Sequence, residues 1–292
     1  MSIETERGGD GPVLVTGGTG TLGTLVVRRL VDAGRDVRVL SRRAGGAEGG
    51  PPVLTGDLDT GEGVDAALAG VEVVVHCAGA SKGDERRAAA LGAAALRAGT
   101  RHLVNISVVG ADRVPVTGRA DRAMFSYYAS KFGSDEAIAS SGVPWTTLRA
   151  TQFHELMLMV ARGMAHLPVV PVPSGMRVQP VAADEVAARL VELSLGAPAG
   201  LVDEMAGPRI MGMDEMVRAY LRARGARRLL MPVPLIGGAG RAIRAGANLA
   251  PDLAVGRQTW EEFLAERLGE GVPGGRDRPR RQEAVTRSAN PG

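Results

Sequence analysis

Short apolar runs alternate with segments of helical periodicity over the first half of the chain. The apolar runs cover residues 12–16, 36–40, 53–54, 71–76, 101–106 and 144–148. Between them, segments whose apolar residues recur every three to four positions cover 22–33, 64–68, 84–98 and about 126–140. Strands that alternate with helices in this way predict successive βαβ units. We therefore expect an α/β fold over residues 1–150, with a doubly wound parallel sheet covered by helices.

The second half of the chain has a different pattern. Residues 155–164 are rich in methionine, 168–180 are extended and punctuated by proline, and 201–205 and 229–235 are short extended runs. Helical periodicity returns over 184–195, 213–223, 240–248 and 259–268. We expect residues 151–268 to form a small C-terminal substrate lobe that is integrated with the sheet. Residues 269–292 contain glycine, proline, arginine and few apolar side chains, which predicts a disordered tail.

Composition narrows the class of protein. Hydrophobic residues make up 45% of the 292 positions and the net charge is only +3. No stripe of basic and aromatic residues is present, so no nucleic-acid partner is expected. The single cysteine, Cys77, excludes an intramolecular disulfide and a multi-cysteine metal site, and we predict no metal. The first residues lack an apolar signal region and no run of about 18 apolar residues occurs, so we expect no membrane contact and a cytoplasmic location.

A glycine-rich turn follows the first apolar run. Gly17, Gly20 and Gly23 lie in the string TGGTGTLG, between the expected strand at 12–16 and the helix at 22–33. Such a turn lets backbone N–H groups and a helix N-terminus face a pyrophosphate, because glycine has no Cβ to block close approach. We predict that the turn binds a dinucleotide together with its neighbours Thr21 and Leu22. A purely structural loop is the alternative.

The second strand ends in two arginines where a carboxylate would favour NAD. Ser41, Arg42 and Arg43 follow the run at 36–40. A carboxylate at this point accepts hydrogen bonds from the ribose hydroxyls of NAD. Guanidinium groups instead pair with a 2′-phosphate, so NADP(H) is favoured over NAD(H). Arginines that simply face water are the alternative.

Two later strand ends are also candidates for cofactor binding. Asp57, followed by Leu58, could accept a hydrogen bond from an adenine amino group, and capping of the next helix by Asp57 or Asp59 is an equally good explanation. Ala78 and Gly79 follow the fourth strand. Their small side chains would let a cofactor pass close to the backbone.

Candidate catalytic chemistry is concentrated in the string YYASK. The chain has three tyrosines and two lysines, and Tyr127 and Lys131 lie four residues apart, which places them on one face of a helix. A cation near a phenol favours the phenolate and makes tyrosine a better acid or base near neutral pH. Ser107, at the end of the fifth strand, could bond the same substrate oxygen. The alternative is an ordinary helix with a buried aromatic and a solvated lysine.

These features together resemble the short-chain dehydrogenase/reductase superfamily. The strings VLVTGGTGTLG, LSRR, HLVNISVVGADRVP, YYASK, SGVPWTTLRATQFHE, QPVAADEVA and AGP look most like its atypical, NmrA-like NAD(P)-binding branch in actinobacteria. The resemblance covers about residues 12–265 and implies a Rossmann-like fold. It is much less specific for the reaction.

The resemblance also implies roles for individual residues. Tyr127 would exchange a proton with the substrate oxygen, Lys131 would lower the tyrosine pKa and hold the nicotinamide ribose, and Ser107 would orient the substrate. The stretch after the sixth strand that usually lies along the nicotinamide is Ala150, Thr151 and Gln152. Weaker candidates at the substrate mouth are Phe153, His154 and Met157, although Met157 could equally fill the core. The fourth strand ends in His-Cys-Ala-Gly instead of the Asn-Asn-Ala-Gly common in the family.

The sequence thus favours an NADPH-dependent oxidoreductase that reduces a carbonyl or a conjugated alkene of a small apolar molecule. Many atypical members of the family have lost the tyrosine and act as redox sensors, so a non-catalytic NADP(H)-sensing regulatory protein is a second hypothesis. An epimerase or dehydratase that retains its cofactor is a third. A homodimer is compatible with the sequence, which leaves the substrate, the reaction direction and the oligomeric state open.

Overall fold

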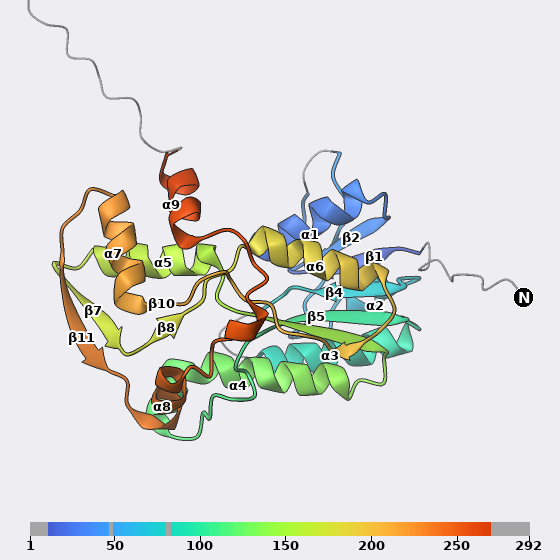
Figure 1. Cartoon of the computed structure of the whole chain (residues 1–292). Coiled ribbons are helices and arrows are strands. Elements are labelled where there is room, and N and C mark those ends of the chain that lie inside the picture. The colour runs from blue at the N-terminus through green and yellow to red at the C-terminus, as the bar shows by residue number, and fades with distance from the viewer. Residues whose placement is uncertain (1–10, 47–48, 80–82, 270–292) are drawn as a thin grey trace, which may run out of the picture.

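A seven-stranded parallel sheet is the centre of the fold (Figure 1). The computed structural model describes residues 11–46, 49–79 and 83–269. The order of the strands is β3-β2-β1-β4-β5-β6-β9, and every neighbouring pair is parallel. The strands are β1 (Val13–Thr16), β2 (Val37–Ser41), β3 (Val53–Thr55), β4 (Val73–His76), β5 (His102–Val108), β6 (Trp145–Ala150) and β9 (Gly200–Leu201). This Rossmann-like α/β architecture confirms the expected fold class.

The strand order places the first two βαβ units on opposite sides of β1. The chain winds from β1 outward to β3, then returns to β4 on the other side of β1. In open α/β sheets, ligands bind beyond the carboxyl ends of the strands where the winding direction changes. The carboxyl ends of β1 and β4 are therefore the expected position of a ligand.

Helices cover both faces of the sheet, as Figure 1 shows. One face packs against α1 (Thr21–Asp32) and α6 (Ala183–Leu195), and the core there includes Val26 and Leu190. The other face packs against α2 (Val64–Leu68), α3 (Asp84–Arg97) and α4 (Arg119–Ala139). The strand side chains are apolar on both faces, as expected for a parallel sheet that is covered on both sides.

Helix α4, which contains Tyr127 and Lys131, is longer than the sequence indicates. It begins at Arg119, seven residues before the expected start, and Asp121 caps its first turn by accepting a hydrogen bond from the Gly118 nitrogen. Phe125 has non-helical dihedral angles (φ −129°, ψ 15°) and separates two helical segments. The expected helix at 126–140 corresponds to the segment after this kink.

The chain leaves the sheet domain for the lobe three times. After β6 it forms α5 (His154–Ala165), returns to the sheet as α6 and β9, and then leaves again. The lobe therefore consists of three separate stretches, residues 154–178, 211–234 and 260–269, with its own core around Met216 and Trp260. Its other elements are β7 (Val169–Ser174), β8 (Arg177–Val178), β10 (Met211–Gly212), α7 (Met213–Ala223), β11 (Leu229–Pro234) and α9 (Trp260–Gly269).

A short connection after β11 returns to the sheet domain. Helix α8 (Gly237–Ala245) packs against α4, with Ile243 and Phe125 in one apolar cluster, and a 3₁₀ turn follows at Pro251–Leu253. None of the helices in the described ranges is both long and apolar enough to cross a bilayer. The tail expected to be disordered lies, from residue 270 onward, outside the described residues.

Candidate functional site

The glycine turn packs too closely for side chains. Gly17 has φ +68°, and a Cβ there would lie 2.6 Å from the Ala78 nitrogen. A Cβ on Gly23 would lie 2.1 Å from the Gly17 oxygen, and the Gly20 nitrogen donates to that same oxygen over 2.9 Å. Only glycine meets these constraints at positions 17 and 23. The turn thus brings the carboxyl end of β1 against the residue that follows β4.

The N-terminus of α1 is open at this turn. In the described part of the chain no side chain caps the helix, whose N-cap is Gly20, and its first turn carries no carboxylate. The unpaired N–H groups and the positive end of the helix dipole therefore suit an anionic phosphate. Thr21 is exposed at this end, whereas the Leu22 side chain is buried in the core and offers only its backbone.

The arginines after β2 face solvent and leave their guanidiniums accessible. Arg42 and Arg43 are exposed, and the Arg43 nitrogen donates to the Ser41 hydroxyl over 3.1 Å. Neither guanidinium forms an ion pair with a residue that the structure describes. The turn and these arginines fit a dinucleotide that carries an additional phosphate.

The residues after β3 are engaged in local structure. Asp57 Oδ1 accepts from the Asp59 nitrogen over 2.8 Å, which is a turn-capping role, and the Leu58 side chain is buried. Asp59 forms ion pairs of 2.9 Å with Arg86 and with Arg87, which lower the pKa of its carboxyl. Neither aspartate caps the next helix, because the N-cap of α2 is Gly63 and no side chain caps it. The capping explanation is therefore wrong, and the contact of Asp57 with an adenine stays a prediction.

Lys131 projects from α4 toward the turn after β4, and Tyr127 lies one helical turn before it on α4. Tyr127 is 38% exposed, whereas Lys131 is buried. Lys131 Nζ lies 3.2 Å from Asp84 Oδ2, and a Cβ on Gly79 would lie 3.0 Å from the same nitrogen. Ser130 Oγ accepts from the Asp84 nitrogen over 3.1 Å. The lysine therefore connects the motif helix, the start of α3 and the small-residue turn after β4.

The charge arrangement around Tyr127 differs from the expectation. Burial of part of the phenol and the carboxylates of Asp84 and Asp135 raise the pKa of Tyr127 to about 12. Lys131 does not lower the pKa of Tyr127 here, and its ammonium lies 3.2 Å from Asp84 Oδ2. The phenol is consequently neutral at neutral pH, which is the form of a proton donor.

A buried polar network lies one helical turn further along α4. Asp135 follows Lys131 by four residues, and it accepts from Asn105 Nδ2 over 3.1 Å and from Arg149 Nε over 3.0 Å. Burial raises the pKa of Asp135, and the Ser107 hydroxyl and the Arg149 guanidinium oppose this shift. Ser107 is itself buried near the end of β5. The sequence analysis missed Asp84 and Asp135, although the four-residue spacing of 127, 131 and 135 was a signal for the second.

The end of β4 holds two titratable groups that the motif analysis did not assign. His76 is buried, its Nδ1 lies 2.7 Å from Thr16 Oγ1, and burial and the Lys131 charge lower its pKa to about 3. Burial raises the pKa of Cys77 to about 12, against the opposing effect of Lys131. A neutral imidazole and an unreactive thiol result, as expected for a core cysteine.

The stretch after β6 uses its side chains internally. Thr151 Oγ1 donates to the Gln179 oxygen over 2.5 Å, and Gln152 Nε2 donates to the Asn248 oxygen over 3.3 Å. Both side chains are buried, and so is Ala150. Their backbone is engaged as well, because the Thr151 nitrogen donates to the Met205 oxygen over 3.0 Å and the Gln152 oxygen accepts from the Val181 nitrogen over 2.9 Å. These residues connect the lobe to the sheet.

The weaker candidates for substrate binding lie in the core. The expectation that His154 and Met157 lie at a substrate mouth is therefore wrong for this structure. His154 is fully buried, stacks on Trp260 and Phe263 with ring centroids 5.9 and 5.0 Å away, and its Nε2 lies 3.0 Å from the Gln258 oxygen. Met157 is buried in the lobe core, and Phe153 packs against the sheet core. The reason is the spacing of α5, whose buried positions 154, 157, 158 and 161 share one face.

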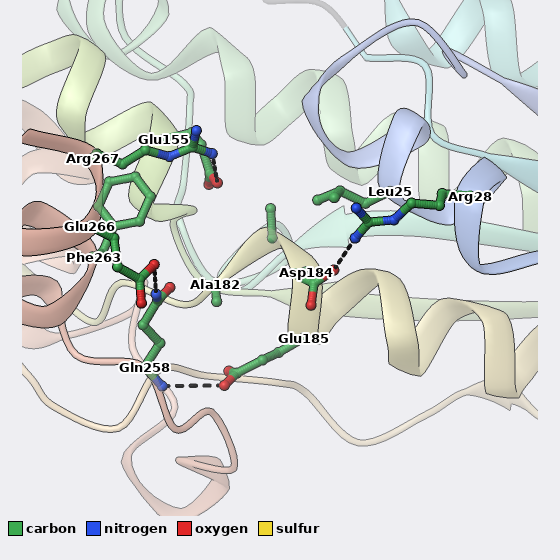
Figure 2. A pocket seen from close by; sticks show the side chains of 11 residues that line it. Leu25, Arg28, Glu155, Ala182, Asp184, Glu185, Gln258, Phe263, Glu266 and Arg267 are labelled. Atoms are coloured by element: carbon green, nitrogen blue, oxygen red, sulfur yellow. Dashed lines mark hydrogen bonds and ion pairs between the residues drawn. The ribbon is translucent and has the colours of Figure 1, made fainter. Parts of the chain in front are cut away.

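A separate cavity of about 400 Å³ lies between α1 and α6 on one side and α9 on the other (Figure 2). It contains none of the glycine-turn residues and neither Tyr127 nor Lys131. Four carboxylates and two guanidiniums line it, and Arg28 pairs with Asp184 across 3.4 Å. A cavity with more carboxylates than cations disfavours a phosphate, so we assign nucleotide binding to the glycine turn. Its charged residues are Arg28, Glu155, Asp184, Glu185, Glu266 and Arg267.

Known proteins match this chain along most of its length. A ceramide reductase of Caulobacter vibrioides is 32% identical over 267 residues, which are 82% of this chain and 79% of the relative. A (4-alkanoyl-5-oxo-2,5-dihydrofuran-3-yl)methyl phosphate reductase of Streptomyces griseus is 34% identical over 162 residues, 54% of each chain, so this match spans about half of that relative. An NAD(P)H azoreductase of Xenophilus azovorans is 28% identical over 221 residues, 73% of this chain and 74% of the relative.

Solved structures share the fold at lower identity. An NADPH-dependent quinone oxidoreductase of Escherichia coli, solved with NADPH, superposes with a TM-score of 0.72 at 18% identity, over 87% of this chain and 99% of that protein. The triphenylmethane reductase of Citrobacter sp. gives a TM-score of 0.70 at 19% identity, over 88% and 99%. At such identities the likeness establishes the fold alone. The model of the NAD(P)H-binding family matches residues 17–193, which begin at the glycine turn. The match in sequence and the turn's geometry together establish that the chain belongs to the NAD(P)H-binding family.

Proposed function

We propose that this protein is an NADPH-dependent reductase of a carbonyl or a conjugated alkene in a small apolar molecule. The observation that carries the proposal is the pair of Tyr127, partly exposed and neutral, and Lys131, buried against Gly79 at the carboxyl end of β4. This edge of the sheet is also where the glycine turn meets Ala78. The reductase relatives support the reaction class.

The chain's residues divide the work of holding the cofactor. The amides of the glycine turn bind the pyrophosphate, and Arg42 and Arg43 bind the 2′-phosphate. Asp57 and Leu58 would border the adenine, and Ala78 and Gly79 would border the adjoining ribose. Lys131 would donate to the nicotinamide ribose, and residues 150–152 would border the nicotinamide. The three lobe stretches would cover the substrate.

The proton comes from Tyr127. When bound, NADPH supplies the hydride to a substrate carbon. The Tyr127 phenol donates a proton to the substrate oxygen, and its raised pKa keeps that proton in place until the substrate accepts it. Ser107 orients the substrate, and its buried hydroxyl has no hydrogen-bond partner among the described residues that would compete for it.

Removal of the phenol tests the assignment. We expect Tyr127→Phe to lower kcat by at least about 100-fold, the low end for lost acid catalysis, with little change in NADPH affinity. The measurement is NADPH consumption against a panel of quinones, ketones and enones. Tyr128→Phe is the matched control, because the neighbouring tyrosine is buried against Phe125. An equal loss in both variants would remove Tyr127 from the mechanism.

A dinucleotide sensor is the second candidate. The observation in its favour is the Lys131–Asp84 pair, because it leaves the tyrosine without an activating cation. A sensor would bind NADPH and discriminate it from NADP⁺ without consuming it on any member of the panel. A cofactor that copurifies and is regenerated in each cycle would instead indicate an epimerase or dehydratase.

The two arginines after β2 test the cofactor preference. Replacement of Arg42 and Arg43 by alanine should weaken NADPH binding by about 10- to 100-fold, since each loses a charged hydrogen bond, and should leave NADH binding unchanged. Fluorescence titration with both cofactors measures this. Equal losses for the two cofactors would contradict the assignment of the 2′-phosphate.

A further inference from the structure

One face of the lobe is apolar without a described partner. Strands β7 and β11 form a separate two-stranded parallel ribbon, in register from Val169 beside Leu229 to Ser174 beside Pro234. Its inner face packs on the lobe core through residues that include Val170 and Val172. The opposite side, called here the outer ribbon face, is also apolar and consists of Val169, Pro171, Pro173, Leu229, Met231 and Val233.

The side chains of the outer ribbon face are open to solvent. Leu229 is 74% exposed, Met231 50%, Val169 41% and Val233 38%. Two apolar neighbours, Leu167 and Ile236, are exposed as well. Parallel strands occur almost only where both faces are covered, whereas strands with one solvated face normally alternate apolar and polar residues. The ribbon therefore has the composition of a covered element.

The two segments that supply this face are basic and lack acids. The two segments that supply the ribbon, 156–183 and 216–251, contain no aspartate or glutamate. Arg227 and Arg228 immediately precede Leu229, and they line a cavity of about 450 Å³ with His166 and Pro168. Neither arginine forms an ion pair with a carboxylate in the described ranges. The nine arginines of these segments are Arg162, Arg177, Arg218, Arg222, Arg224, Arg227, Arg228, Arg241 and Arg244.

The charges of these segments distinguish the molecules that could cover the outer ribbon face. A symmetric dimer would press this face against a copy of itself, and neither segment offers a carboxylate to pair with the partner's arginines. Residues 270–292 contain few apolar side chains and five arginines, so their composition does not match the face. An anionic bilayer supplies both complements, because its phosphates pair with guanidiniums and its acyl boundary accepts apolar side chains.

We propose that the outer ribbon face docks on the surface of an anionic phospholipid bilayer, with Arg227 and Arg228 at the headgroup phosphates and Leu229 and Met231 at the acyl boundary. The docking is peripheral and needs no spanning helix. It differs from the sequence expectation of no membrane contact, which considered only signal and spanning segments. The site is independent of the reductase chemistry proposed above.

Vesicle flotation with the full chain tests this docking. The protein should float with vesicles of phosphatidylglycerol and phosphatidylcholine, and not with vesicles of phosphatidylcholine alone. Raising the salt from about 0.05 M to about 0.5 M should release it, since screening weakens the contribution of the arginines. Replacement of Arg227 and Arg228 by serine should weaken binding by about 25-fold, roughly fivefold for each charge.

Apolar and matched control variants complete the test. Leu229→Ser with Met231→Ser should weaken vesicle binding at least about tenfold, because both side chains lose their apolar burial. Val255→Ser and Arg257→Ser should bind like the unaltered protein, since both residues are exposed outside this face. NADPH titration of each variant verifies that the fold is intact.

Two results would overturn the proposal. One is failure of the unaltered protein to float with the anionic vesicles, or an equal loss in the control variants. The other is a dimer in sedimentation equilibrium that Leu229→Ser with Met231→Ser converts to monomer, because a second copy of the chain would then cover the face.

Discussion

The turn after β1 and the stretch after β6 both follow strands of the same sheet, and both were expected to contact the cofactor. At the first, side chains are absent, and a Cβ on Gly17 or Gly23 would collide with backbone. At the second, Thr151 and Gln152 have side chains that could bind a ligand, but the protein itself is their partner. A turn without side chains leaves its backbone N–H groups accessible to a ligand. A position with well-suited side chains can instead use them to join two parts of the fold.

The basic residues of the candidate site show the same difference between groups open to a ligand and groups bonded within the protein. Arg42 and Arg43 stand exposed at the end of β2, where a charged group costs little to maintain. Lys131 is buried, and a buried ammonium needs a counter-charge, which Asp84 supplies at 3.2 Å. The guanidiniums of Arg42 and Arg43 therefore remain available to a ligand. The Lys131 ammonium is paired with Asp84, whose carboxylate contributes to the raised pKa of Tyr127.

The largest effect that we expect is on the stability of the lobe. Met157→Ala should lower the free energy of unfolding by about 2–5 kcal/mol, because it leaves a cavity in the lobe core, while KM changes little. Denaturant unfolding and steady-state kinetics measure the two quantities. Met159→Ala, on the 63% exposed neighbour, should change stability by less than about 0.5 kcal/mol. If Met157→Ala raised KM and left the stability unchanged, Met157 would belong to the substrate site.

A methyl group added at the glycine turn should produce the next largest effect. Gly23→Ala places a Cβ against the Gly17 oxygen, and the shift that it forces should weaken NADPH binding by about 10- to 100-fold. The control is Gly163→Ala, where a Cβ on α5 meets no atom within 4 Å. That change should leave binding unaltered and increase stability slightly, since alanine favours a helix over glycine. Similar NADPH affinities in the two variants would contradict the role of the turn.

The smallest expected effect concerns pH. A nearby carboxylate disfavours the phenolate, so Asp84 contributes to the raised pKa of Tyr127, and its removal should lower that pKa. The proton donor is lost as the pH rises through its pKa. The alkaline limb of the kcat profile should therefore move to lower pH in Asp84→Asn, while the larger effect of burial remains.

The exposed neighbour provides the control for the pH experiment. Glu85→Gln changes the charge one position along α3 without touching the Lys131 pair. Its pH profile should match that of the unaltered enzyme. An alkaline limb that stays in place in Asp84→Asn would exclude Asp84 from the control of Tyr127.

The strand and helix pattern was largely readable from the sequence. The expected helices at 64–68 and 213–223 coincide with α2 and α7, because local apolar periodicity determines such elements. The return of α6 and β9 to the sheet was not foreseen. It depends on contacts between residues far apart in the chain, such as Thr147 beside Leu201, for which a single sequence carries no signal.

The sequence by itself determined the parallel sheet, the glycine turn and the candidate pair of Tyr127 and Lys131, since each follows from local spacing and from the absence of side chains. Only the tertiary structure decided what surrounds them. Asp84 forms an ion pair with Lys131. His154 and Met157 are buried in the core, and one apolar face of the lobe is exposed to solvent. Burial and electrostatic partners depend on which elements pack together, and packing is a property of the whole fold.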